Sequence, residues 1–169
     1  MATLVSEDKE FVSTFSISPR EIIYIKVKGV DEQKWQHFEI AIANGSRSLT
    51  FQTPPRDGDA SFSAAIEDIQ VVADAYLLCR QPQDEIKKLI ERLDDLLSGK
   101  RAKVLFEPAE PSFEFSLQNS GGGMKAEIFV DAGNVETSIY RWDALGIRFF
   151  TGEEQVRRFI EELKSEFDC

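Results

Sequence analysis

The chain has 169 residues, of which 42% are hydrophobic and 30% are charged. This length supplies one hydrophobic core and is short for two, so the sequence predicts a single domain over residues 1–169. The formal net charge is −10, from 30 acidic and 20 basic side chains. Such an acidic surplus disfavours contact with nucleic acid and with anionic membranes, and it favours encounters with basic proteins.

Neither a membrane span nor a secretion signal is expected. No stretch approaches the roughly 18–20 apolar residues that cross a bilayer. Residues 1–10 are polar and acidic where a secretion signal has basic residues and then an apolar block. We therefore expect a cytoplasmic protein whose first ten residues are flexible. Its two cysteines agree with a reducing compartment, since Cys79 falls among apolar residues and Cys169 is poorly placed for a structural disulfide.

Alternation of apolar and polar residues predicts strands in the first third of the chain. The four expected strands are Phe11–Ile17, Glu21–Lys28, Trp35–Ala43 and Arg47–Thr53. Asn44 and Gly45 stand between the last two, and because both residues tolerate a positive φ they predict a hairpin turn. We therefore expect the third and fourth strands to pair antiparallel.

Helical periodicity then predicts two consecutive amphipathic helices. In the first, from Ser63 to Arg80, apolar residues recur on one helical face. The second begins near Pro82, which suits a first helical turn, and it ends where Gly99 supplies a left-handed cap. We expect both helices to cover one face of a sheet.

The last part of the chain returns to strands and closes with a helix. The expected strands are Lys103–Phe106, Ser112–Gln118, Met124–Asp131, Val135–Trp142 and the short run Ile147–Phe150. Gly121–Gly123 predicts a turn between two of them, and Thr151 with Glu154 matches a capping box at the start of the terminal helix. The element order predicts an α+β fold: an antiparallel twisted β-sheet with two central helices and a C-terminal helix packed on it.

Residues that carry out bond-making chemistry are scarce. His37 is the only histidine, and it falls in a predicted strand. No Ser-His-Asp or Cys-His arrangement can be assembled without it. The cysteines and this histidine lack zinc spacing, and the glycine run lacks the lysine and serine or threonine of a phosphate-binding loop. We therefore predict no catalytic residue, no metal site and no cofactor.

An acidic stretch between two predicted strands is one candidate for binding. Residues 106–115 contain two prolines, which stiffen the chain. The acidic residues of this stretch are Glu107, Glu110 and Glu114. They form a solvated turn, a landing site for arginine and lysine of a partner, or an acid and base pair for catalysis.

A second distinctive stretch lies near the C-terminal helix. Tyr140 and Trp142 fall on the same side of a predicted strand, where they are core residues or exposed anchors for a partner. We predict a partner-binding set made of these two aromatic residues and of the acidic residues Glu107, Glu110, Glu114 and Asp131.

These motifs also carry a family resemblance. A long helix is followed by the strand that ends in Phe106-Glu107-Pro108, then by a sheet, and then by Phe149-Phe150-Thr151 with its helix. This arrangement, from about residue 60 to residue 169, resembles the WapI-like immunity proteins of bacterial polymorphic toxin systems. The resemblance implies a small cytosolic protein that binds the toxin domain made by its own cell and blocks it.

The leading hypothesis is a non-enzymatic immunity-type inhibitor that occludes a cognate toxin. Its partner would be a protein with a basic surface, and it would bind neither nucleic acid nor membrane. Two alternatives remain open: a carboxylate-dependent enzyme of small molecules, and a structural or adaptor protein that self-associates through a sheet edge. The sequence does not give the oligomeric state.

Overall fold

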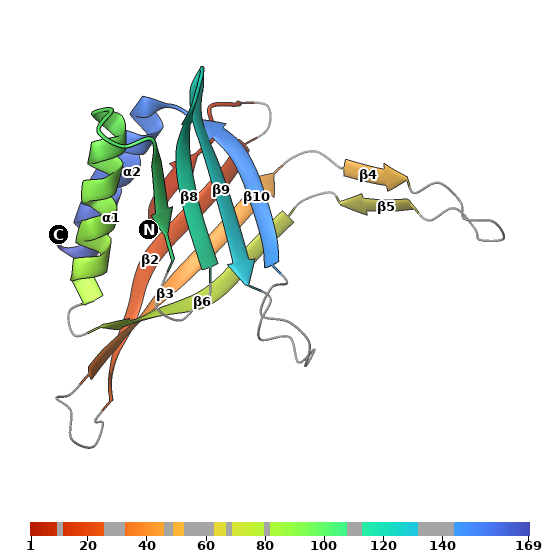
Figure 1. Cartoon of the computed structure of the whole chain (residues 1–169). Coiled ribbons are helices and arrows are strands. Elements are labelled where there is room, and N and C mark those ends of the chain that lie inside the picture. Colours follow the sequence, from red (N-terminus) through yellow and green to blue (C-terminus); the bar gives the residue numbers. More distant parts are fainter. Residues whose placement is uncertain are drawn as a thin grey trace.

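The computed structural model shows an α+β fold with two antiparallel sheets of four strands each, a separate pair of strands and two helices in its described part (Figure 1). It describes residues 1–9, 12–25, 33–45, 49–52, 63–66, 69–79, 82–107, 113–131 and 144–169. The elements are β1 (Ala2–Val5), β2 (Val12–Ile25), β3 (Gln33–Gly45), β4 (Leu49–Gln52), β5 (Ser63–Ile66), β6 (Ile69–Cys79), α1 (Pro82–Leu97), β7 (Lys103–Phe106), β8 (Phe113–Ser120), β9 (Gly123–Asp131), β10 (Ala144–Thr151) and α2 (Glu153–Phe167).

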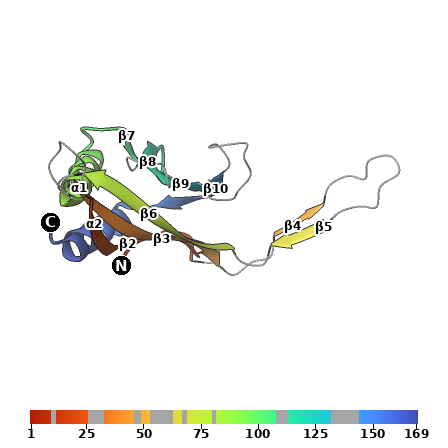
Figure 2. The ribbon, with the colours of Figure 1, turned by 90° about the horizontal axis from the view of Figure 1, so that it is seen from below.

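The N-terminal sheet has the strand order β1-β2-β3-β6, and the C-terminal sheet has the order β10-β9-β8-β7. Figure 2 shows the two sheets as facing layers, with both helices at one flank and the β4–β5 pair projecting from the other. The fold class is therefore α+β as predicted, but two sheets face each other where one sheet was expected. That all 169 residues form one domain stays a prediction.

The helix predicted from Ser63 to Arg80 is wrong, because this part of the chain forms β5 and β6. All 11 residues of β6 have a register partner in β3, from Ile69 with Asn44 to Cys79 with Lys34. The run is apolar at both odd and even positions, so it suits a strand as well as a helix. The long neighbouring strand β3 decides between the two, because it offers backbone partners along the whole run.

The hairpin predicted at Asn44 and Gly45 is also wrong. β3 ends at Gly45 and pairs with β2 and β6, whereas β4 pairs with β5. The Asn-Gly pair marks the end of a strand correctly, but it does not determine which strand becomes the neighbour. All 11 residues of β6 pair with β3. β6 is therefore the neighbour of β3 in the position where the sequence predicted β4.

Other boundaries differ in smaller ways. The first two predicted strands are one strand, β2, with a register shift between Pro19 and Ile22. This irregularity accommodates the proline, which lacks a backbone N–H. The expectation of a flexible first segment does not hold for Ala2–Val5, which forms β1 with Ala2 and Leu4 fully buried. The predicted strand Val135–Trp142 lies outside the described residues.

The structure confirms α1, β7, β8, β9, β10 and α2 close to their predicted positions. Gly99, with φ +75°, ends α1 in the left-handed conformation, and Gly121, with φ +39°, lies in the turn between β8 and β9. The predicted capping box is wrong: the N-cap of α2 is Gly152 and makes no side-chain cap bond. The Thr151 hydroxyl instead donates to the carbonyl of Val5 at 2.8 Å, so it joins β10 to the end of β1.

The core lies between the two sheets and the helices, and aromatic rings occupy its centre. Phe15 of β2 stacks on Phe115 of β8 with ring centroids 5.1 Å apart and planes inclined by 12°. Phe159 of α2 meets Phe15 edge-on, at 6.0 Å and 60°. All three rings are buried, so a single contact point joins both sheets and the C-terminal helix.

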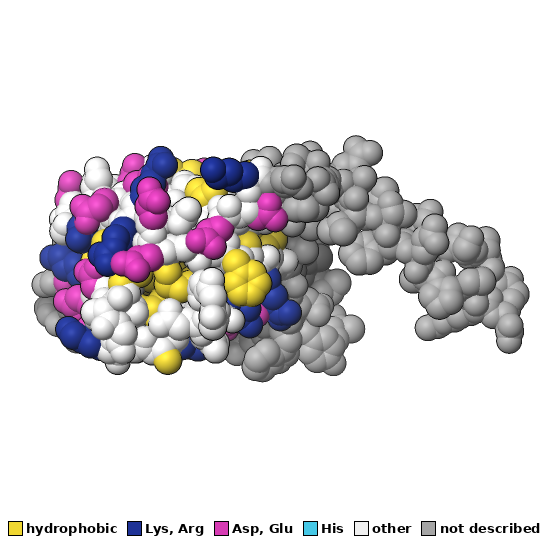
Figure 3. All heavy atoms as spheres, turned by 90° about the horizontal axis from the view of Figure 1, so that it is seen from above, with side chains coloured by type: hydrophobic (Ala, Val, Ile, Leu, Met, Phe, Trp, Pro, Cys, Tyr) yellow, Lys and Arg dark blue, Asp and Glu magenta, His cyan; other side chains and the backbone are white. Residues whose placement is uncertain are grey.

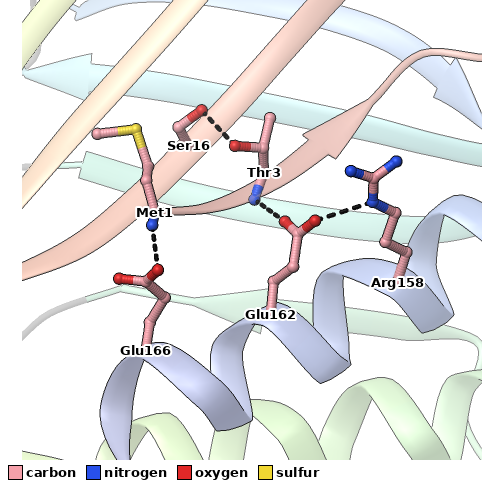
Figure 4. A network of polar contacts seen from close by, with 6 residues as sticks. All are labelled: Met1, Thr3, Ser16, Arg158, Glu162 and Glu166. Carbon is pink, nitrogen blue, oxygen red and sulfur yellow. Dashed lines mark hydrogen bonds and ion pairs between the residues drawn. The ribbon is translucent and has the colours of Figure 1, made fainter.

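Helix α2 covers the open edge of β1 (Figure 4). The backbone N–H of Thr3 donates to Oε2 of Glu162 at 2.8 Å, and Nε of Arg158 donates to Oε1 of the same carboxylate at 2.8 Å. The amino group of Met1 pairs with Glu166 one turn further along α2. Unpaired N–H groups on an edge strand otherwise invite another strand, so these carboxylates close the edge.

Helix α1 binds a backbone carbonyl, an acceptor rather than a donor, on the edge of the C-terminal sheet. Nη1 of Arg92 donates to the backbone carbonyl of Leu105 in β7 at 3.0 Å. A helix side chain thus satisfies a strand acceptor here, just as Glu162 satisfies a strand donor on β1. The two helices therefore contribute to the fold through side-chain contacts with the sheet edges as well as through their apolar stripes.

Replacing the central ring of the core tests the aromatic contact. We expect Phe15→Ala to lower the free energy of unfolding by about 3–5 kcal/mol, because it removes a buried ring and leaves a cavity between the sheets. Urea denaturation followed by circular dichroism measures the change. Phe150→Ala is the matched control: this side chain is 56% exposed, and its loss is expected to cost less than about 0.5 kcal/mol. Equal effects of the two variants would contradict the assignment.

Removing the carboxylate that closes β1 tests the edge contact. We expect Glu162→Ala to lower the free energy of unfolding by about 1–3 kcal/mol and to speed hydrogen exchange of the Thr3 amide, which loses its acceptor. Glu161→Ala is the control, since that side chain is 73% exposed and pairs with Lys164 one turn away. Unchanged exchange at Thr3 in the first variant would show that the carboxylate does not cap this strand.

Candidate protein-binding surface

One end of the C-terminal sheet gathers the connections that carry the predicted binding residues. We call it the loop end: it comprises the end of β7, the start of β8, the end of β9 and the start of β10. The register places Phe106 opposite Phe115, and Asp131 opposite Ala144, at this end. Both connections that hold the candidates, from β7 to β8 and from β9 to β10, therefore leave the sheet and return to it here.

Glu107 and Glu114 come together at the loop end. Glu107 directly follows β7, one position beyond the register pair of Phe106 with Phe115, so it stands across from Glu114 at the start of β8. Glu107 is exposed and Glu114 is partly buried. Neither carboxylate forms an ion pair with another described residue. Two negative charges that have no ionic partner within the described ranges thus stand at this end of the sheet, where cationic groups of another molecule can bind them.

The remaining predicted residues are placed by the backbone only in part. Asp131 is the last residue of β9, so its backbone belongs to the loop end. Glu110, Tyr140 and Trp142 lie outside the described residues, within the two connections that begin and end there. The structure thus brings together Glu107, Glu114 and the backbone of Asp131, while the side-chain positions of the two aromatic residues stay predictions.

The outer face of the C-terminal sheet carries a polar cluster that the sequence analysis missed. Glu127 of β9 pairs with Nε of Arg148 at 2.7 Å and with Nζ of Lys125 at 3.3 Å. Its side chain is 17% exposed, so the two cations neutralise a largely covered carboxylate. The alternation of polar and apolar residues in both strands was visible in the sequence, but the register that places Arg148 opposite Glu127 was not.

An aromatic ring covers the glycine of β10 on the same face. The ring of Phe129 lies over Gly146, where an added Cβ would overlap it, and the Arg148 guanidinium stands 5.9 Å from the ring centroid. Leu105 and Phe150 are exposed by 44% and 56%. The outer face is therefore mixed, with apolar groups among charges of both signs.

The face of the described residues that Figure 3 draws shows no broad area of one charge. In the view from above, acidic and basic side chains alternate over the described part of the molecule, with hydrophobic side chains between them (Figure 3). The two helices are more acidic than the outer face of the C-terminal sheet. Helix α2, for example, has five glutamates and three basic residues. Each of the three basic residues pairs with a glutamate of the same helix. A partner that approaches this face therefore meets local groups of charge rather than a uniform acidic surface.

The described residues offer little for catalysis. Burial raises the pKa of the Cys169 thiol, so the reactive thiolate is scarce near neutral pH. Within the described ranges no group of three His, Cys, Asp or Glu side chains is arranged to hold a metal ion. His37 belongs to β3, but its side chain lies outside the described part.

Comparison with known proteins gives the family. Residues 68–168 match the immunity protein WapI-like family. The chain belongs to this family. The predicted resemblance is thereby confirmed, and the match covers β6, α1, the whole C-terminal sheet and α2. No curated protein and no solved structure matches the chain. Of the helices in the described ranges, neither is long and apolar enough to cross a membrane.

Substitution of the covered glycine tests the geometry of the outer face. We expect Gly146→Ala to lower the free energy of unfolding by about 1–3 kcal/mol, because the new Cβ would overlap the Phe129 ring and lie 2.8 Å from the Ile128 carbonyl oxygen. Gly122→Ala, where nothing stands within 4 Å, is the control and is expected to change stability by less than about 0.5 kcal/mol. Thermal unfolding compares the two, and a neutral Gly146→Ala would contradict the packing described.

Proposed function

We propose that this protein is an immunity protein that binds a cognate toxin domain and blocks it by occlusion. The observation that carries the proposal is the family match over residues 68–168, which includes every strand of the C-terminal sheet. A protein that neutralises another by covering it needs a stable surface and no chemistry of its own. We further propose that it acts in the cytoplasm, without a cofactor and without binding nucleic acid or membrane.

The loop end is the proposed contact surface. Its support is the pair Glu107 and Glu114, which the register brings to the same sheet end and which have no ionic partner in the described part of the chain. By contrast, Glu127 is already neutralised by two cations and has little capacity for a third. An unpaired carboxylate pair favours lysine and arginine of a partner, both during approach and in the complex.

The partner is therefore a toxin domain with basic residues at its contact surface. Glu110 and Asp131 add to the same negative region in this proposal, and Tyr140 and Trp142 act as apolar anchors. Aromatic anchors surrounded by charges are typical of the residues that dominate binding energy in protein complexes. The net charge of −10 increases the rate of encounter with such a partner.

Charge reversal at the loop end tests the proposal. Where a large secreted protein with a variable C-terminal domain is encoded immediately upstream, that domain is the partner for the measurement. We expect the wild-type chain to bind this domain and to rescue cells that produce it. The double variant Glu107→Lys and Glu114→Lys is expected to weaken binding by about 10- to 100-fold, with most of the change in salt dependence and association rate. Titration calorimetry and stopped-flow mixing measure both quantities.

A matched control keeps the charge change and moves it elsewhere. Glu91 and Asp94 are exposed on α1 and, like the loop-end pair, make no ion pair with a described residue. The double variant Glu91→Lys and Asp94→Lys is expected to change the affinity for the toxin domain by less than about threefold, because it acts only through the long-range electrostatic potential of the protein. Equal losses in both double variants would remove the loop end from the proposal, and absence of binding by the wild type would remove the immunity function.

A further inference from the structure

The two sheets have four edge strands, and three of them are engaged by other parts of the described chain. The carboxylate of Glu162 closes β1, and Arg92 caps the carbonyl of Leu105 on β7. At the end of β10, the carbonyl of Phe150 accepts a hydrogen bond from the backbone N–H of Glu7 at 2.9 Å. The fourth edge strand is β6, which ends the N-terminal sheet.

β6 has few of the devices that usually protect an edge strand, since Asp74 is the one charged residue among its 11. Proteins blunt such edges with proline, lysine, short length or a bulge, or they cover the edge with another element. The 11 residues of β6 contain no proline and no basic residue, and the pairing with β3 runs without a register shift. Within the described ranges no strand pairs with its outer side, although α1 lies near the Cys79 end. Among the described residues, the outward backbone donors and acceptors of β6 therefore have no strand partner.

Resting on the proposed function, we propose that β6 receives an extended strand of the toxin domain, which adds to the N-terminal sheet as its fifth strand. Strand addition supplies affinity through main-chain hydrogen bonds and specificity through the side chains that alternate along the new strand. In the view from below, β6 and the loop end face the same side of the molecule (Figure 2). A single partner approaching from that side meets both.

Charge favours a basic strand as the occupant. The register places Asp74 of β6 opposite Glu39 of β3, so two acidic residues stand at neighbouring positions across the strands. Like charges directly opposite each other are unfavourable, and a cationic residue on an added strand beside Asp74 relieves this. The same basic partner therefore suits the loop end and the edge of β6.

A second copy of this chain suits the edge less well. Asp74 is the middle residue of Ile69–Cys79, so a fully overlapping two-fold pairing of β6 with itself would set Asp74 opposite Asp74. Each chain also carries a net charge of −10, which opposes self-association. The family match adds a second argument, because it begins at residue 68 and β6 is the strand of the N-terminal sheet that it includes.

Residue-resolved hydrogen exchange tests the proposal on the unmodified protein. The probe is the upstream-encoded toxin domain in a catalytically inactive form, added in excess to the labelled chain. In the free chain, the alternate amides of β6 that do not face β3 should exchange rapidly. In the complex, we expect these amides to slow by at least about tenfold, while the amides within α2 change little.

The outcomes separate this proposal from the proposed function. A complex that forms with no change at β6 overturns strand addition and leaves the immunity function standing. Slow exchange at all β6 amides in the free dilute chain shows that the edge is already covered, and slowing that grows with chain concentration assigns the edge to a second copy; either result overturns the proposal. If no complex forms, the immunity function falls and this proposal falls with it.

A substitution provides an independent readout. We expect Asp74→Lys to weaken binding of the toxin domain by about tenfold, since it places a cation beside a basic strand. Asp94→Lys on α1, an exposed residue of the same type, is the control and should change affinity by less than about threefold. Thermal unfolding of both variants identifies any loss of folded protein. Equal affinity of the two folded variants would contradict a basic strand at β6.

Discussion

The stack of Phe15 on Phe115 is the contact on which the arrangement of the molecule depends. It joins the N-terminal sheet to the C-terminal sheet, and Phe159 meets the same rings from α2. Because the strands alternate, the residues that flank Phe115 at odd positions, Phe113 and Leu117, are buried, while Glu114 faces outward. The orientation that fills the core thus also fixes which side of β8 another molecule can reach.

The helices complete this arrangement at the sheet edges. An edge strand presents donors and acceptors that are not satisfied within its sheet, and an amphipathic helix placed beside it provides side chains that reach them. Glu162 binds a donor on β1 and Arg92 binds an acceptor on β7, so each helix supplies the charge that its strand group requires. The pattern makes β6 distinctive, because it is the long edge strand for which the described chain provides no comparable contact.

Local patterns determined how much of the fold was predictable. The helices α1 and α2 and the strands around Gly121 were predicted because periodicity, a glycine cap and a short turn act within a few residues of sequence. The helix expected from Ser63 to Arg80 is wrong, because the run that forms β6 fits both periods and its partner β3 is distant in sequence. For the site, the stretch 106–115 indicated Glu107 and Glu114, but the Glu127 cluster depends on the register between β9 and β10, which sequence alone did not give.

Net charge and local charge have separate consequences for recognition. The surplus of acidic residues acts over a distance and raises the rate of encounter with any basic molecule, so by itself it gives little discrimination. On the outer face of the C-terminal sheet much of this charge is cancelled, since Arg148 and Lys125 neutralise Glu127. In the proposed complex, discrimination therefore depends on acidic groups that have no ionic partner among the described residues, such as Glu107 and Glu114. It depends also on the backbone groups of β6, whose spacing fits an extended chain. A partner that satisfies both has to match positions of charge and a strand register at once, which a generally basic protein does not do.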